Sequence, residues 1–496
     1  MQSNGGRNIL RRALFNALFL TLIFFANPFG LRTATEKYSE DLIISFLSPW
    51  YPAKHQNEVT IILLDDSFMQ EHGNRYPVEY PTLRQLLRVI GNYQPKAVFF
   101  DLLQHYEHSD GLESWFQQIK KSDFPVYMAS SPAFDTPEEL EHPDSLRHKL
   151  KMASAKFTAV SWSGSKHYYP LLIANESDQE TNTDQQNTPT LTAALSLYRE
   201  WCKTTTDKCQ NTQEEVDNNT LFQNAMVVRW SNKTAPKQEA YLQLSEGCQQ
   251  ETEGKYKHLL HTVISQVEYG FSDYEDRKEQ QRSRCFNMLT LSATSLVKPG
   301  AMNSSELRDA LKSRIVMVGY NLIGSPDDVQ SPLHGKLPGV FFHAMALDNL
   351  INLGDEYWHV PKNINGAISI SDYLEGFLQC LVSWLVFTYR YSYIERAPNS
   401  TDRVRKSVRN GLLCLLGLSL VSFVLVKISI IHFKLGPMNW FALTAVVSLA
   451  VPTFLYHKLT EIKTAIKKLW QREDNKPLVD GPELKVSEGE HYENAG

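Results

Sequence analysis

The chain has 496 residues, with 50 basic and 55 acidic side chains and a formal charge of −5. Hydrophobic residues make up 42% of it, and its mean hydropathy is that of a soluble protein. Residues 33–370 carry no long basic stripe, which argues against a nucleic-acid partner.

Four apolar segments stand near the two ends of the chain and predict membrane-spanning helices. They cover residues 13–26, 376–389, 411–432 and 438–456. The last two are close to the roughly 20 apolar residues that cross a bilayer. Gln379 and Ser383 interrupt the segment 376–389, so a helix in a soluble core remains the alternative there.

Basic residues predict the orientation of these segments. The clusters are Arg7, Arg11 and Arg12, residues 390–409, and residues 458–472. The short loop 433–437 carries a single lysine. Because positively charged loops stay cytoplasmic, four spans place both termini inside and the large polar region outside. A cleaved signal peptide is the alternative for the first segment, although an A-x-A site is missing.

The outer region begins with alternating strand and helix patterns. Strands are predicted at 59–64, 97–101 and 125–131, and helices at 81–93 and 111–121. The strand segments are continuous apolar runs, as strands buried on both faces require. The first two strands and the helix between them form a β-α-β unit, which implies parallel strands. An α/β domain with a mainly parallel sheet is therefore expected.

The pattern is looser from 132 to 300 and becomes regular again afterwards. Helices are predicted at 191–201, 306–313 and 340–353, and strands at 225–230 and 314–320. Long polar stretches between them read as surface loops. The predicted organisation is a cytoplasmic N-terminus and anchor (1–32), an outer α/β domain (33–370), three grouped spans (371–456) and a cytoplasmic helix with a tail (457–496).

Four of the six cysteines lie in the outer region: Cys202, Cys209, Cys248 and Cys285. They belong to a polar insertion at about 202–285. Four cysteines in an oxidising compartment indicate two disulfides. Of the three possible connectivities we expect Cys202–Cys209 and Cys248–Cys285. A zinc site is the alternative, although no C-x-x-C or nearby histidine pair supports it. No cofactor is predicted.

Polar residues follow several predicted strands and form the candidate binding site. They are Asp65, Asp66, Ser67, Asp101, Asp327, Asp328 and His343. Ligands of open α/β sheets bind beyond the carboxyl ends of the strands, where parallel strands would gather these groups. Such a cluster could hold a cation, or bind a cationic or hydroxylated ligand. The alternative is ordinary, because aspartates also cap helices and begin turns.

Catalytic motifs are missing from the sequence, so no enzyme activity is predicted. It contains no G-x-S-x-G elbow, no H-E-x-x-H and no P-loop. The run Asp65-Asp66-Ser67 lacks the D-x-D pattern of aspartyl phosphatases. A hydrolase using Asp65 as nucleophile or metal ligand remains the third functional alternative.

Three blocks of sequence, in this order, resemble the CHASE type-2 sensory family. They are VTIILLDDSFMQEHGNRYPVEYPTLRQLLRVIGNYQPKAVFFDLL, TLTAALSLYREW and RIVMVGYNLIGSPDDVQSPLHGKLPGVFFHAMALDNLI. The likeness covers most of residues 35–456. It implies an extracytoplasmic sensory domain of a bacterial membrane receptor. The family-like positions are Asp65, Asp66, Asp101, Asp327, Pro338, Gly339 and His343. Tyr76-Pro77 departs from the tryptophan-proline pair that the family has there.

The resemblance predicts a multi-pass protein of the bacterial inner membrane whose main domain is periplasmic. Only about 40 residues follow the last apolar segment, too few for the kinase or cyclase that family members carry. We therefore expect a sensor or scaffold that contacts membrane lipid and signals through a separate partner protein, and a homo-oligomer is possible. A structural subunit of an envelope complex is the alternative. Residues 457–473 could continue the last span, lie on lipid or bind the partner.

Overall fold

The fold is taken from a computed structural model of the chain. It describes residues 3–27, 31–73, 75–131, 137–162, 168–173, 189–205, 213–217, 219–238, 285–324, 327–360 and 369–393, with single positions at Cys209, Asn211, Val424, Lys434 and Gly436. Every structural statement below concerns these residues.

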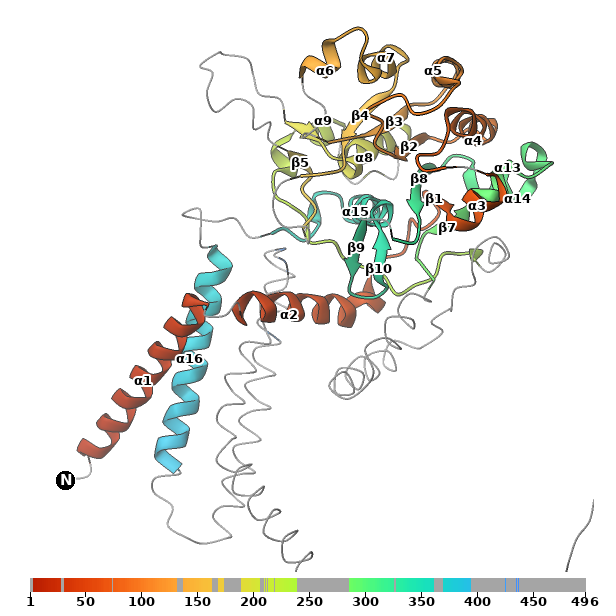
Figure 1. Ribbon diagram of the computed structural model, residues 1–496. Helices are drawn as coiled ribbons and strands as arrows, with labels where there is room; N and C mark the ends of the chain where they lie inside the picture. Colours follow the sequence, from red (N-terminus) through yellow and green to blue (C-terminus); the bar gives the residue numbers. More distant parts are fainter. Residues whose placement is uncertain are drawn as a thin grey trace, which may run out of the picture. The chain divides into compact units, whose positions relative to one another are not determined.

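A six-stranded parallel sheet forms the centre of the α/β domain (Figure 1). Its strands are β1 (Val59–Asp65), β2 (Ala97–Asp101), β3 (Val126–Ser130), β4 (Lys156–Ala159), β7 (Leu289–Ser292) and β8 (Ile315–Asn321). Their order is β4-β3-β2-β8-β1-β7, and every neighbouring pair is parallel. The late strand β8 therefore lies between β1 and β2.

Helices cover both faces of the sheet. One face packs on α4 (Tyr80–Asn92), α5 (Leu112–Lys120), α7 (Leu146–Met152), α13 (Thr294–Val297) and α14 (Ser305–Leu311). The opposite face packs on α8 (Ala193–Thr204) and α15 (Gly339–Leu353). Side chains alternate along each strand, as in β2, where Ala97 and Phe99 face α8 and α15 while Val98 and Phe100 face the other layer. Burial on both faces accounts for the continuous apolar runs of these strands.

Smaller elements complete the described chain. They are α1 (Ser3–Ala26), α2 (Leu31–Leu47), η2 (Ser48–Trp50), α3 (Asp66–Glu71), α6 (Pro137–Glu141), β5 (Leu172–Ile173), β6 (Thr190–Leu191), α9 (Gln213–Asp217), η4 (Asn219–Phe222), η6 (Ala301–Asn303), β9 (Asp328–Ser331), β10 (Gly335–Pro338), η7 (Gly354–Glu356) and α16 (Ile370–Tyr393). β9 and β10 form an antiparallel hairpin, and so do β5 and β6.

The α/β class and the parallel sheet predicted from the sequence are confirmed. The strand predicted at 225–230 is wrong as a member of the sheet. Its residues are extended, but Met226 makes only isolated pairs with Tyr169 and with His359. Met226, Val227 and Val228 are buried, which gives the segment the apolar pattern of a strand. It packs against the α8 and α15 layer instead of entering the sheet.

Among the described residues, no helix is long and apolar enough to cross a membrane. The four-span prediction therefore finds no support in this part of the chain. Its segments at 411–432 and 438–456 lie outside the described residues, apart from a few single positions.

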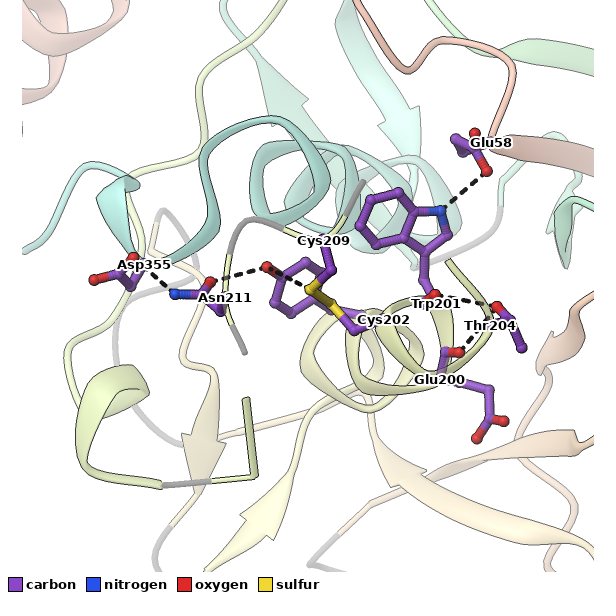
Figure 2. The surroundings of a disulfide bond; sticks show 9 residues. Glu58, Glu200, Trp201, Cys202, Thr204, Cys209, Asn211 and Asp355 are labelled. Carbon is purple, nitrogen blue, oxygen red and sulfur yellow. Dashed lines mark hydrogen bonds between the residues drawn. A yellow bond between two sulfur atoms is a disulfide. The ribbon is translucent and has the colours of Figure 1, made fainter. Parts of the chain in front are cut away.

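The predicted disulfide between Cys202 and Cys209 is present, at the end of α8 (Figure 2). The Tyr198 hydroxyl lies 3.7 Å from Cys209 Sγ and donates to Asn211 Oδ1 at 2.9 Å. Asn211 in turn donates to Asp355 Oδ1 at 3.0 Å, which ties this segment to η7. Cys285 is also disulfide-bonded, and Cys248, its expected partner, lies outside the described residues.

Replacing Cys202 and Cys209 together by alanine is expected to lower the free energy of unfolding by about 2–3 kcal/mol, since a short cross-link removes loop entropy from the unfolded chain. Denaturant unfolding of the full-length chain measures the change. Cys380→Ala is the matched control, because Cys380 is a free thiol. Equal stability of the double variant and the wild type would contradict a stabilising role for this disulfide.

Candidate ligand site at the strand ends

The neighbouring strands β1, β8 and β2 are followed by segments that run to opposite faces of the sheet. After β1 and β2 it continues into α4 and α5 on one face, whereas after β8 it leads to α15 on the other. Connections that diverge in this way leave room beyond the carboxyl ends of the strands, and ligands of open α/β sheets bind at such points. β2 ends there at Asp101, which pairs in register with Gly319 of β8.

Two glycines let α15 lie close to the end of β8. A Cβ atom on Gly319 would lie 2.6 Å from Cβ of Val340, and one on Gly339 would lie 2.6 Å from Oδ1 of Asp327. The backbone amide of Gly339 also donates to the Asp327 carbonyl at 2.9 Å. A side chain at Gly319 would force the helix away from the strand, whereas one at Gly339 would displace the Asp327 carboxylate. The Asp327 carboxylate is therefore held against the start of α15.

Asp101 is the acid that the sheet places most deeply. It continues the side of β2 that carries Ala97 and Phe99 and so faces α15. Its side chain is 7% exposed, and its Oδ2 lies 3.9 Å from Nε2 of His343. Burial raises the pKa of Asp101 well above its usual value, and the neighbouring Asp327 carboxylate raises it further.

His343 is neutral and carries its proton on Nε2. The Tyr169 hydroxyl oxygen accepts from the Ala194 amide at 3.1 Å, so we assign its hydrogen to Nδ1 of His343, 2.7 Å away. Nδ1 then accepts, and Nε2–H faces Asp101. Burial lowers the pKa of His343 to about 3, so the imidazole is uncharged at neutral pH. At 3.9 Å the contact with Asp101 is neither an ion pair nor a hydrogen bond.

Aromatic rings border this group of polar side chains. The Trp162 ring centroid lies 5.2 Å from that of Tyr169 and 6.3 Å from that of His343. Trp162 is half-buried, whereas Tyr169 is fully buried. We call Asp101, Trp162, Tyr169, Asp327 and His343 the strand-end cluster. It combines acidic groups with aromatic rings at the point where the topology favours a ligand.

Comparison with known proteins identifies the family. The model of the CHASE2 domain matches residues 17–387. The chain belongs to the CHASE2 domain family. CHASE2 domains are extracytoplasmic sensory domains, in agreement with the resemblance seen in the sequence. Neither a curated protein nor a solved structure matches the chain.

Four of the predicted site residues of this CHASE2 protein serve local structure. Asp65 caps α3, since its Oδ1 accepts from the Phe68 amide and from the Ser67 hydroxyl, each at 2.8 Å. Asp66 Oδ2 accepts from the Ile323 amide at 3.0 Å. Asp328 pairs with Lys336 at 3.3 Å across the β9–β10 hairpin. These contacts correspond to the ordinary roles of aspartate in caps and turns. A binding role for these residues stays a prediction.

Asp101, Asp327 and His343 are the predicted residues that meet in the CHASE2 strand-end cluster. Sequence reasoning did not find Trp162 and Tyr169, which follow β4. Their partner His343 lies on α15, and no spacing rule connects the two segments. Among the described residues, no group of three or more histidine, cysteine, aspartate or glutamate side chains could hold a metal ion.

Proposed function

We propose that this CHASE2 protein is an extracytoplasmic sensor that binds a small ligand at the strand-end cluster. The observation that carries the proposal is Asp101. Its side chain is 7% exposed, and the nearest basic group, Nε2 of His343, is 3.9 Å away, too far for a hydrogen bond. Burial and the neighbouring Asp327 disfavour the charged form of Asp101, a cost that a ligand with a donor or a positive charge offsets.

The helix α15 offers a route by which ligand binding changes the rest of the domain. It carries His343 of the cluster and, farther along, Asp348. Asp348 Oδ2 accepts from the Tyr51 hydroxyl at 2.7 Å, and Tyr51 follows α2 and η2. Asn349 also donates to the Tyr51 hydroxyl, at 3.2 Å. A shift of α15 on ligand binding would therefore move the end of α2. This physical connection supports the relay, and coupling measurements must test it.

The signal would then pass to a separate partner protein. This part of the proposal rests on the sensory character of CHASE2 domains, because a sensed signal needs an output. We propose that the apolar segments anchor the protein in the inner membrane, with the CHASE2 domain on the periplasmic side. The basic helix predicted at 457–473 is one candidate contact for lipid or for the partner. Self-association into a homo-oligomer is a further arrangement compatible with such a relay.

Thermal unfolding of the full-length chain tests ligand binding. Putrescine, choline, glucose, N-acetylglucosamine, citrate and CaCl₂ serve as probes. A ligand that binds only the folded state at 100 times its Kd stabilises the protein by about 2.7 kcal/mol. We expect at least one probe to raise the Tm of the wild type and to leave Asp101→Asn unshifted. Asp309→Asn, at an exposed pair with Lys237, is the matched control and should respond like the wild type. If no probe shifts the wild type, small-ligand sensing loses its support.

A structural subunit of an envelope complex is the second candidate. The observation that favours it is the apolar surface of α1. Its large exposed side chains include Leu10, Leu14, Phe15, Leu18, Phe19 and Leu22. Exposed apolar surface of this kind marks contacts with protein or lipid. Two results together would favour this function over sensing. One is a protein partner that co-purifies at a constant ratio, and the other is the absence of a Tm shift with every probe.

A further inference from the structure

We infer that the ligand of the strand-end cluster is a small organic cation that carries an ammonium group. The inference deepens the proposed sensor function and rests on it.

The charges around Asp101 call for a cation. The Asp327 carboxylate is close enough to disfavour ionisation of Asp101, and no cationic side chain of the described residues pairs with Asp101. The nearest basic group, His343, is uncharged because burial lowers its pKa. A bound ammonium group would let Asp101 ionise and would interact favourably with both carboxylates. An anionic ligand would be repelled by both carboxylates.

The hydrogen-bonding pattern also fits a donor-rich ligand. Nε2–H of His343 is too far from Asp101 Oδ2 to hydrogen-bond, so that oxygen can still accept. Nδ1 of His343 is already occupied by the Tyr169 hydroxyl. Carboxylates are strong acceptors, and their charge-assisted bonds to N–H donors are about twice as strong as neutral ones. A primary ammonium group such as that of putrescine supplies up to three such donors, whereas the quaternary ammonium of choline supplies none and would depend on charge and ring contact.

The rings of the cluster suit the carbon atoms of an organic cation. Trp162 is half-buried, and its ring packs edge-on against Tyr169 and His343. Indole is the best of the side-chain rings for cation–π contact. Among the described residues, no group of three or more histidine, cysteine, aspartate or glutamate side chains could hold a metal ion, so a bare divalent ion is less well matched.

Isothermal titration of the full-length chain with putrescine and with choline tests the class of ligand. The neutral isostere of choline, 3,3-dimethyl-1-butanol, serves as the charge control. We expect binding of at least one of the two cations and at least a tenfold weaker response to the neutral compound. Asp101→Asn and Asp327→Asn should each weaken binding of the cation at least tenfold. Asp309→Asn, at an exposed pair with Lys237 outside the cluster, is the matched control and should change it less than threefold.

The pH dependence of cation binding and the effect of further variants show whether a loss of binding reflects lost contacts with the cation or a loss of folding. Cation binding should strengthen from pH 5 to pH 8, because the Asp101 carboxyl, whose pKa is raised, ionises over a higher range than usual. Asp327 is exposed, so Asp327→Asn keeps the test available even if Asp101→Asn fails to fold. Trp162→Leu should weaken binding of choline severalfold through the loss of the ring face.

The outcomes distinguish the inference from the sensor function. If both cations are silent while glucose, N-acetylglucosamine or citrate binds and Asp101→Asn abolishes that binding, the cation class is wrong and the sensor function stands. Equal binding of choline and its neutral isostere would also overturn the cation class. If none of these compounds binds the wild type, the sensor function and the cation class both fall.

Discussion

Replacing Asp348 by alanine is expected to lower the free energy of unfolding by about 3–5 kcal/mol, the usual cost of breaking a buried charged or polar network. Asp348 is 1% exposed, and its carboxylate accepts from Tyr51 at 2.7 Å, Asn287 at 3.3 Å and Asn352 at 3.1 Å. Alanine would leave these donors buried without the acceptor that they share. Denaturant unfolding of the full-length chain measures the loss. Asp328→Ala, at an exposed pair, is the control and should cost under about 1 kcal/mol.

Asp348 also gives the stability a pH dependence whose sign can be stated. Burial raises its pKa to about 7, from an ordinary value of 3.8, while the hydrogen bonds from Tyr51, Asn287 and Asn352 lower it. The unfolded chain therefore loses this proton at lower pH than the folded chain does. The contribution is complete below pH 3.8 and is lost as the pH rises through about 7. Asp348→Asn should remove this part of the slope between pH 4 and 7. An unchanged slope would show that Asp348 is not its source.

Gly319→Ala is expected to cost about 3 kcal/mol, near the upper end of ordinary overpacking penalties. The new Cβ would lie 2.6 Å from Cβ of Val340, which is fixed to the backbone of α15 and cannot rotate away. This clash can be relieved only if α15 moves away from β8. Because α15 also carries His343, the variant should weaken ligand binding at the strand-end cluster as well. Stability is measured by denaturant unfolding, and binding by the titrations described above.

Gly91→Ala is the matched control for this variant. A Cβ on Gly91 would meet only the outer atoms of the Phe124 ring, at 3.1 and 3.2 Å, and this ring can move aside. Gly91 lies within α4, where alanine is a better helix former by about 0.5–1 kcal/mol. Its net effect should stay under about 1 kcal/mol. Equal losses at the two positions would refute the close approach of β8 and α15.

The periodicity of the sequence was sufficient for the main elements of the fold. The apolar runs at 59–64 and 314–320 correspond to β1 and β8, and the helix predicted at 340–353 corresponds to α15. The neighbour relations were not predictable, because hydrophobic pattern does not encode strand order. The β-α-β unit at the start is parallel as expected, yet β8 separates its two strands. The apolar run at 225–230 was predicted as a strand but does not enter the sheet. A segment that is buried without pairing to other strands has the same apolar pattern as a strand.

The candidate site was predictable in part. The rule that ligands lie beyond strand ends selected Asp101, and the topology brings Asp327 and His343 to it. The same rule also selected Asp65, which instead caps α3, because cap and ligand aspartates look alike in sequence. Tyr169 and Trp162 carry no signal of their own. Their part in the cluster depends on packing between segments far apart in the chain.

The position of β8 has a consequence for the synthesis of the protein. A nascent chain completes β2 at Asp101, but the strand that joins β1 to β2 begins only at Ile315. Until then the facing edges of both apolar strands lack their native partner, and unpaired edges favour association with other chains. The sheet cannot close until the chain has been made as far as β8. Safe biogenesis should therefore depend on a holding chaperone that protects the first hundred residues or so until β8 arrives.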